Sequence, residues 1–161
     1  MKKNFSMLFV GLVMALVSCH TPQTNLQNNS AATALQHEQL PQLAFKVRVS
    51  QMYPQRYYSR PVLSEFTLEV KDGWLYSNLP YIGQVHSPSF YSVSKGLNFE
   101  APIQDFAKRR NEKKHSNEFE FAVKNEEDSY VYVVTIYDNG TADIYVRAQK
   151  RDAIRFSGDL E

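Results

Sequence analysis

Several residue types that mark well-known functional classes are scarce in this 161-residue chain. Cys19 is its single cysteine, which excludes an internal disulfide bond. The six glycines are never grouped, so the sequence has neither a phosphate-binding loop nor a dinucleotide fingerprint. The net charge is +1, and without a marked basic excess we do not expect the chain to bind nucleic acid. Nucleotide-binding, nucleic-acid-binding and disulfide-stabilised proteins are therefore set aside as classes.

Residues that commonly bind metals or perform catalysis are few and scattered. The four histidines lie far apart, and none has a Cys, Asp or Glu at a zinc-ligand spacing. The G-x-S-x-G motif of many serine hydrolases is absent. Glu126, Glu127 and Asp128 are adjacent, but solvated carboxylates commonly gather in a turn before a strand. We therefore assign no catalytic residue and expect no metal and no cofactor.

Residues 1–19 have the features of a bacterial lipoprotein signal peptide. Lys2 and Lys3 precede an apolar run from Phe5 to Val17, which is too short for a spanning helix because such a helix needs about 20 apolar residues. The run ends in LVSC, which resembles a lipobox, the sequence at which lipoproteins are cut so that the cysteine becomes acylated. We expect a lipid such as palmitate on Cys19, anchoring the protein to a membrane. The alternative is an ordinary signal peptide with a chance cysteine.

From about residue 43 onward the sequence is typical of antiparallel strands. The strongest signal runs from Ser129 to Ala148, where two runs of β-forming residues meet at Asn139-Gly140. Asn-Gly favours a type I′ turn, in which both central residues have positive φ. The first arm of this hairpin is apolar on both faces, which predicts an inner strand buried on both sides. Asp72-Gly73 predicts a second hairpin by the same reasoning.

Roughly eight short strands alternate with turn signals, and no helical periodicity longer than two turns follows Leu40. This pattern predicts a single all-β antiparallel domain, with a β-sandwich favoured over a barrel. The preceding stretch is rich in Gln, Asn, Thr, Ser and Ala, which is the composition of a flexible tether. The expected organisation is a signal peptide at 1–19, a tether at 20–42 and a β-domain at 43–161.

Four phrases in order along the chain resemble a known family: NLPYIGQVHS at 78–87, GLNFEAPI at 96–103, YDNGTADIYV at 137–146 and IRFSGDLE at 154–161. The family consists of Bacteroidetes lipoproteins known as domain of unknown function 4251. The resemblance implies an all-β envelope domain and supplies no reaction, cofactor or catalytic residue. In such lipoproteins an acidic cluster just after the cysteine resembles a surface-export signal. Its absence here favours an outer-membrane lipoprotein that faces the periplasm.

Aromatic residues in the irregular loops are the main candidates for a binding site. Exposed rings on the loops of a β-scaffold can stack on sugars or peptide side chains, so we expect a non-enzymatic protein that binds an envelope protein or a glycan. The rings could instead pack together over the open end of the fold as a small second core. Two other readings are a small periplasmic hydrolase or lyase with its site in the 80–95 loop, and a structural lipoprotein without a ligand. The candidate binding residues are Tyr57, Tyr58, Tyr81, Phe90 and Tyr91.

Overall fold

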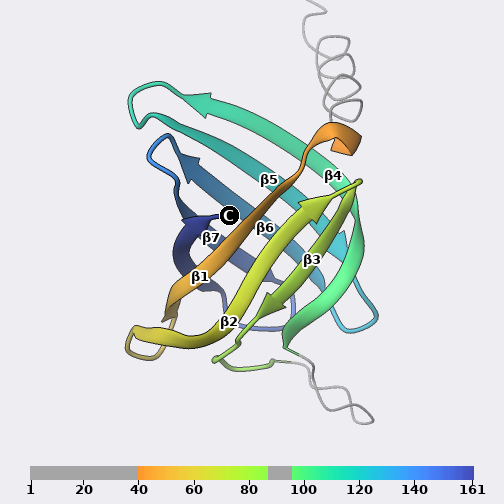
Figure 1. The fold of residues 1–161 in the computed structure, drawn as a ribbon. Helices are drawn as coiled ribbons and strands as arrows, with labels where there is room; N and C mark the ends of the chain where they lie inside the picture. Colours follow the sequence, from red (N-terminus) through yellow and green to blue (C-terminus); the bar gives the residue numbers. More distant parts are fainter. Residues whose placement is uncertain (1–39, 87–95) are drawn as a thin grey trace, which may run out of the picture.

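The computed structural model describes residues 40–86 and 96–161, which form a β-barrel (Figure 1). Its eight strands follow one another around the barrel in chain order, and each is antiparallel to its neighbours. A short 3-10 helix, η1 (Leu40–Gln42), precedes them. The strands are β1 (Phe45–Pro54), β2 (Arg60–Lys71), β3 (Trp74–Leu79), β4 (Leu97–Asn111), β5 (Ser116–Lys124), β6 (Ser129–Tyr137), β7 (Thr141–Ala148) and β8 (Ile154–Leu160).

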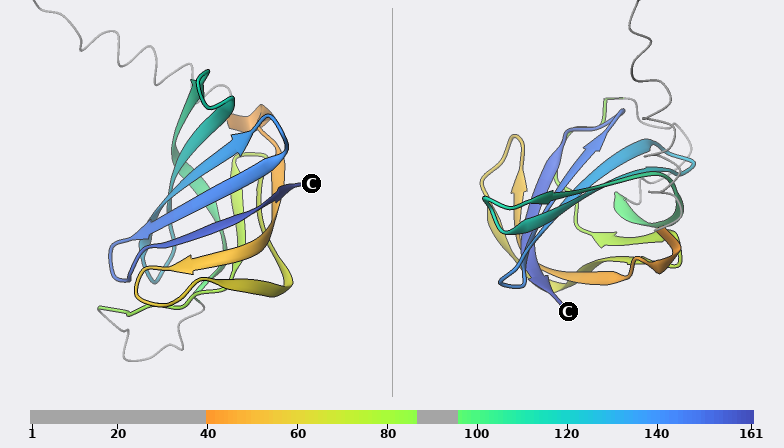
Figure 2. Two further views of the ribbon diagram at one scale, coloured as in Figure 1. Left: turned by 90° about the vertical axis from the view of Figure 1, so that its left-hand side faces the viewer. Right: turned by 90° about the horizontal axis from the view of Figure 1, so that it is seen from above.

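Pairing between the first and last strands closes the sheet. Val47 to Pro54 of β1 pair with Leu160 to Ile154 of β8, and the right-hand view in Figure 2 shows the strands as a ring. The predicted all-β antiparallel domain is confirmed, whereas the preference for a sandwich over a barrel was wrong. Side chains alternate with a period of two in both a sandwich and a barrel, so the local pattern does not distinguish the two architectures. The long-range pairing of β1 with β8 identifies the barrel.

Alternate side chains along the strands point inward and form the hydrophobic core. A barrel of about eight strands has an interior that side chains can fill. Tyr132 lies entirely inside, and its hydroxyl is satisfied because Oη lies 3.1 Å from Ser77 Oγ. Burial raises the pKa of Tyr132 well above the usual range. The largest fully buried side chains include Tyr130, Tyr132, Phe121, Phe156, Leu68, Leu75 and Leu97.

The β6–β7 hairpin contributes one inward face to this core. Tyr130, Tyr132 and Val134 of β6 are buried, as are three alternating residues of β7. Val131 and Val133 on the other face of β6 are only half-buried. The expectation that β6 is buried on both faces was therefore wrong. A closed single-layer sheet has one interior, so every strand keeps an outward face.

The two predicted hairpin turns form by different routes. At Asp72-Gly73 both residues have positive φ, 52° and 78°, and Lys71 pairs with Trp74, as in a type I′ turn. At the second turn only Gly140 has positive φ, 86°, and its N–H bonds to Tyr137 O at 2.9 Å. This is a type I turn followed by a left-handed glycine, so the type I′ expectation was wrong there. The hairpin itself is confirmed.

Strand β4 is the longest and changes partner midway. Leu97–Pro102 pair with β3, and Ile103–Asn111 pair with β5. Because β3 ends and β4 begins at the same end of the barrel, the chain between them starts and finishes at that end (Figure 1). Its described part, residues 80–86, belongs to the candidate site below.

The described fold begins slightly before the predicted start of the domain. Leu40 is buried against the core, and Leu43 N donates a hydrogen bond to Leu40 O at 3.1 Å. The predicted signal peptide and most of the predicted tether lie outside the described residues. Within residues 40–86 and 96–161, no helix has the length and apolar character needed to cross a membrane.

Candidate functional site

Four connections lie at one end of the barrel, which we call the floor: residues 55–59, 80–86, 125–128 and 149–153. They join successive strand pairs and lie at the lower end in Figure 1, opposite η1. The β7–β8 connection is central to the floor because it contacts the other three. Val85 forms an isolated antiparallel bridge with Arg151, so the 80–86 segment runs directly against this connection.

Arg151 is buried and joins the β7–β8 connection to the β5–β6 connection. Its Nη2 lies 3.1 Å from Glu127 Oε2, and its Nε lies 3.4 Å from Asp128 Oδ2. The guanidinium carbon is also 5.4 Å from the ring centre of Tyr81 and 5.5 Å from that of Tyr130. A buried arginine is stable only when its charge is paired, and here two carboxylates and two aromatic rings surround it.

Asp152, the next residue, holds the other two connections. Its Oδ2 accepts hydrogen bonds from Gln84 N at 3.1 Å and Arg56 Nε at 2.9 Å, and its Oδ1 lies 3.0 Å from His86 Nε2. The Gln84 N–H, the Arg56 guanidinium and His86 together lower the pKa of Asp152 below its ordinary value. The side chain is almost fully buried, whereas Arg56 and His86 are half exposed.

Tyr81 fixes the 80–86 segment against the floor. Its hydroxyl donates toward Gln84 O at 3.2 Å and Asp152 O at 3.0 Å, and burial raises its pKa to about 12. Gly83 allows this arrangement because a Cβ at that position would collide with the Tyr81 hydroxyl and approach the Tyr81 ring carbon to 2.8 Å. The 80–86 segment is therefore packed closely against the end of the barrel.

The most exposed apolar side chains of the floor belong to the β1–β2 hairpin. Tyr58 is 94% exposed and Tyr57 50% exposed, although Arg56 beside them is bonded to Asp152. Leu63 on β2 is 95% exposed. The β1–β2 register explains Leu63, because four residues of β2, Val62 to Glu65, bulge out opposite a single residue of β1.

The five aromatic candidates fall into three groups. Tyr57 and Tyr58 share one exposed loop. Tyr81 is only partly buried, but it packs against the core and its hydroxyl donates a hydrogen bond to Asp152 O. It therefore helps to cover the end of the barrel, which was the alternative to a binding role. Asp152 joins the loop of Tyr57 to the segment of Tyr81, so these two connections form one surface. Phe90 and Tyr91 lie outside the described residues.

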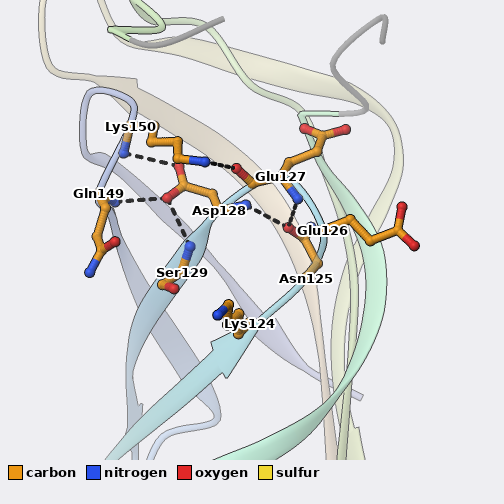
Figure 3. Close-up of a pocket in the computed structure, with 8 residues that line it drawn as sticks. All are labelled: Lys124, Asn125, Glu126, Glu127, Asp128, Ser129, Gln149 and Lys150. Carbon is orange, nitrogen blue, oxygen red and sulfur yellow. Dashed lines mark hydrogen bonds between the residues drawn. The ribbon is translucent and has the colours of Figure 1, made fainter. Parts of the chain in front are cut away.

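A pocket of about 180 Å³ lies beside the β5–β6 turn (Figure 3). Several of its polar groups form hydrogen bonds with one another. Asn125 Oδ1 accepts from the N–H groups of Glu127 and Asp128, and Asp128 accepts from the N–H groups of Gln149 and Lys150. The groups that hold the turn are therefore already hydrogen-bonded, and the pocket fits a braced turn better than a ligand site.

The buried position of Asp128 corrects the prediction of a solvated acidic turn. Glu126 is exposed as expected, but Asp128 has no solvent-accessible side chain and pairs with Arg151. Arg151 and Asp152 were not predicted as site residues either, because a charged pair between two strands is typical of a solvated turn. No local signal distinguishes these residues, since their burial depends on connections more than 20 positions away, as with Arg151 and Glu127, 24 apart.

One pair of side chains on the floor, His86 and Asp152, has a geometry suited to acid–base chemistry. The Asp152 carboxylate lies 3.0 Å from His86 Nε2, and the His86 side chain is half exposed to solvent. Among the described residues, no three His, Cys, Asp or Glu side chains cluster as metal ligands would. The floor thus combines a rigid polar frame, an oriented histidine and exposed tyrosines.

An eight-stranded meander barrel with a packed core and an internally braced floor defines the class to which this structure belongs. A family model, domain of unknown function (DUF4251), matches residues 27–160. The chain therefore belongs to this family. Comparison with curated proteins finds no match.

Proposed function

We propose that this protein is a lipid-anchored protein of the bacterial cell envelope that binds a protein or glycan partner through its floor. The lipid would be carried on Cys19, at the end of a signal peptide, and the anchor would lie in the outer membrane with the barrel in the periplasm. The described chain begins at η1, opposite the floor (Figure 1), so a barrel anchored through the preceding residues can present the floor away from the membrane. No reaction is required for this function.

The observation that carries this proposal is the exposure of Tyr57 and Tyr58 on a loop whose base is held. Arg56 Nε donates a hydrogen bond to the buried Asp152 at 2.9 Å, and Tyr57 and Tyr58 follow directly in the chain. This bond fixes the base of the loop that carries the two rings. Presenting exposed aromatics rigidly lowers the entropy cost of binding. Tyrosine and arginine are also among the residues enriched in the binding hot spots at the centres of protein interfaces.

Crosslinking in cells tests the binding role. We expect the Tyr57→Ala/Tyr58→Ala variant to lose a crosslinked partner that the unchanged protein retains. Tyr145→Ala is the matched control, because Tyr145 is an exposed tyrosine that lies on the outer face of β7 and not in the loop. Equal loss in the control, or retention in the double variant, would contradict a binding role for the loop.

Metabolic labelling tests the anchor separately. Cys19→Ala should abolish incorporation of a palmitate analogue and leave an unprocessed precursor. Ser18→Ala is a suitable control because it alters the neighbouring residue and keeps the cysteine. Continued labelling of the Cys19→Ala protein would overturn the anchor and leave the binding role to be judged by the crosslinking result.

The His86–Asp152 pair favours a second candidate, a small periplasmic hydrolase or lyase with its site in the 80–95 loop. A carboxylate that orients a histidine is a common part of general acid–base sites. If this candidate holds, His86→Gln abolishes turnover of a substrate found by screening ester, amide and glycoside probes while the melting temperature stays near that of the unchanged protein. Turnover that survives this substitution would exclude His86 as the base.

A further inference from the structure

The outer face of β3 carries two aromatic side chains that the core does not use. Leu75, Ser77 and Leu79 point into the barrel, so Trp74 and Tyr76 point outward. Trp74 is 41% exposed and Tyr76 is 38% exposed. Trp74 is the single tryptophan of the chain, and its position on the outside leaves a large, rigid ring available to a partner.

Tyr76 lies between two carboxylates in one cross-strand row. Glu69 of β2 pairs with Tyr76, and Tyr76 pairs with Glu100 of β4. Neighbouring strands are about 4.8 Å apart, so the two glutamate positions lie about 10 Å from each other with the ring between them. Within the described residues, neither glutamate forms an ion pair, and no hydrogen bond involves the Tyr76 hydroxyl.

The adjacent row adds an apolar surface beside these carboxylates. Trp74 pairs with Lys71 on one side and with the exposed Pro102 on the other. Lys71 is followed by Asp72, so these two charges offset each other. Lys46, the neighbour of Glu69 on β1, is bonded to Glu161 at 2.9 Å and attracts Glu69 more weakly. The face therefore keeps an excess of negative charge around two exposed rings.

We propose that this face, formed by Glu69, Trp74, Tyr76 and Glu100, binds a lysine or arginine side chain presented by a protein partner. A cation over an aromatic ring is attracted by the negative face of the ring, and flanking carboxylates add direct attraction and hydrogen-bond acceptors. Charge complementarity selects this occupant, because the two glutamates would repel an anionic lipid, an acidic glycan or a nucleic acid.

This surface is independent of the floor. Trp74 immediately follows the β2–β3 turn, at the end of β3 opposite the 80–86 segment. In Figure 1 this turn lies near η1, at the end of the barrel where the described chain begins. A partner bound here would leave Tyr57 and Tyr58 uncovered, so the two surfaces can be tested separately.

Trp74 provides the measurement, because all tryptophan emission from the chain comes from this residue. The full chain is titrated with a short oligoarginine peptide at an ionic strength of about 0.15 M, where loose surface attraction is largely screened. We expect a saturable change in Trp74 emission. An oligoglutamate peptide and a neutral oligosaccharide serve as the comparison ligands and should produce no change.

Paired charge variants locate the binding. Glu69→Gln/Glu100→Gln should raise the Kd for oligoarginine about tenfold, as expected for loss of two carboxylates beside a cation–π contact. Glu112→Gln/Glu126→Gln removes the same charge from two exposed turn residues and should leave the Kd nearly unchanged. Circular dichroism melting confirms that each variant is folded.

Three results would overturn the proposal. The first is a Trp74 emission that oligoarginine leaves unchanged, and the second is a Kd for oligoarginine that rises equally in the Glu112→Gln/Glu126→Gln control. The third is a change in emission with the oligosaccharide or oligoglutamate instead of with oligoarginine. Tyr76→Leu gives a further check, because it keeps an apolar side chain and removes the aromatic face. Its Kd should rise, and an unchanged Kd would remove Tyr76 from the site.

Discussion

Arg151 and Asp152 are consecutive, oppositely charged and buried, and each binds a different pair of chain segments. Arg151 reaches the β5–β6 connection and the ring of Tyr81, while Asp152 reaches the β1–β2 connection and the backbone of the 80–86 segment. Two adjacent residues thus join all four connections of the floor. This arrangement makes the floor a rigid support for the exposed tyrosines beside it.

Removing the positive charge of this pair should be costly. Arg151→Met leaves Asp128 buried beside an uncharged side chain, and we expect the free energy of unfolding to fall by about 3–5 kcal/mol. Arg155→Met is the control, because Arg155 forms a half-exposed pair with Asp143 and should cost about 1 kcal/mol or less. Urea unfolding measures both. Equal losses in the two variants would show that the buried pair of Arg151 stabilises the fold no more than an exposed pair does. Adding Asp128→Asn to Arg151→Met should restore part of the stability, because it removes the unpaired buried charge.

The β6–β7 turn depends on the backbone of Gly140. Its φ of 86° is unfavourable for a β-branched residue, so Gly140→Val should lower stability by about 1–2 kcal/mol. A Cβ at this position meets no atom within 4 Å, so the loss would come from the backbone alone. Gly140→Asn should be tolerated better, because asparagine adopts this conformation more readily. A melting curve that Gly140→Val leaves unchanged would contradict the assigned turn.

Closure of the barrel depends on the small size of Gly158. A Cβ there would collide with the carbonyl oxygen of Arg48 and lie 2.9 Å from Val49 Cα, at the bulge where β8 meets β1. We expect Gly158→Ala to cost about 1–3 kcal/mol through overpacking. Asp159→Ala, at the next and exposed position of β8, should change stability by about 0.5 kcal/mol or less. Hydrogen exchange of the β1–β8 amides would report the loss directly, and unchanged protection would argue against a tight seam.

Acid should loosen the floor through Asp152. The Gln84 N–H and the Arg56 guanidinium lower the pKa of Asp152 in the folded state, so the folded protein binds a proton here less readily than the unfolded chain does. The resulting stability is fully present above the unfolded pKa of about 3.9 and is lost as the pH falls through the lower folded pKa. Melting temperatures at about pH 7 and about pH 3 should differ less for Asp152→Asn than for the unchanged protein. Equal acid sensitivity in the two proteins would exclude Asp152 as the cause.

The local sequence was sufficient for most of the strands and for most of their turns. The alternation of apolar and polar residues determined which side chains of β7 face the core, and Asp72-Gly73 determined a tight turn, because both effects act within a few residues. The same local pattern assigned both faces of β6 to burial and favoured a sandwich. Neither outcome is decided locally, since each depends on whether the sheet closes on itself.

Tertiary structure alone decided the closure of the barrel and the composition of the floor. The β1–β8 ladder joins the two ends of the domain, and the ion pairs of Arg151 and Asp152 join turns that the sequence presents as separate and solvated. Likewise, Glu69, Tyr76 and Glu100 lie on three different strands, and only the strand register puts them in one row. Burial and charge pairing are properties of neighbours in space, so a pattern read along the chain determines the elements but not the sites that they form.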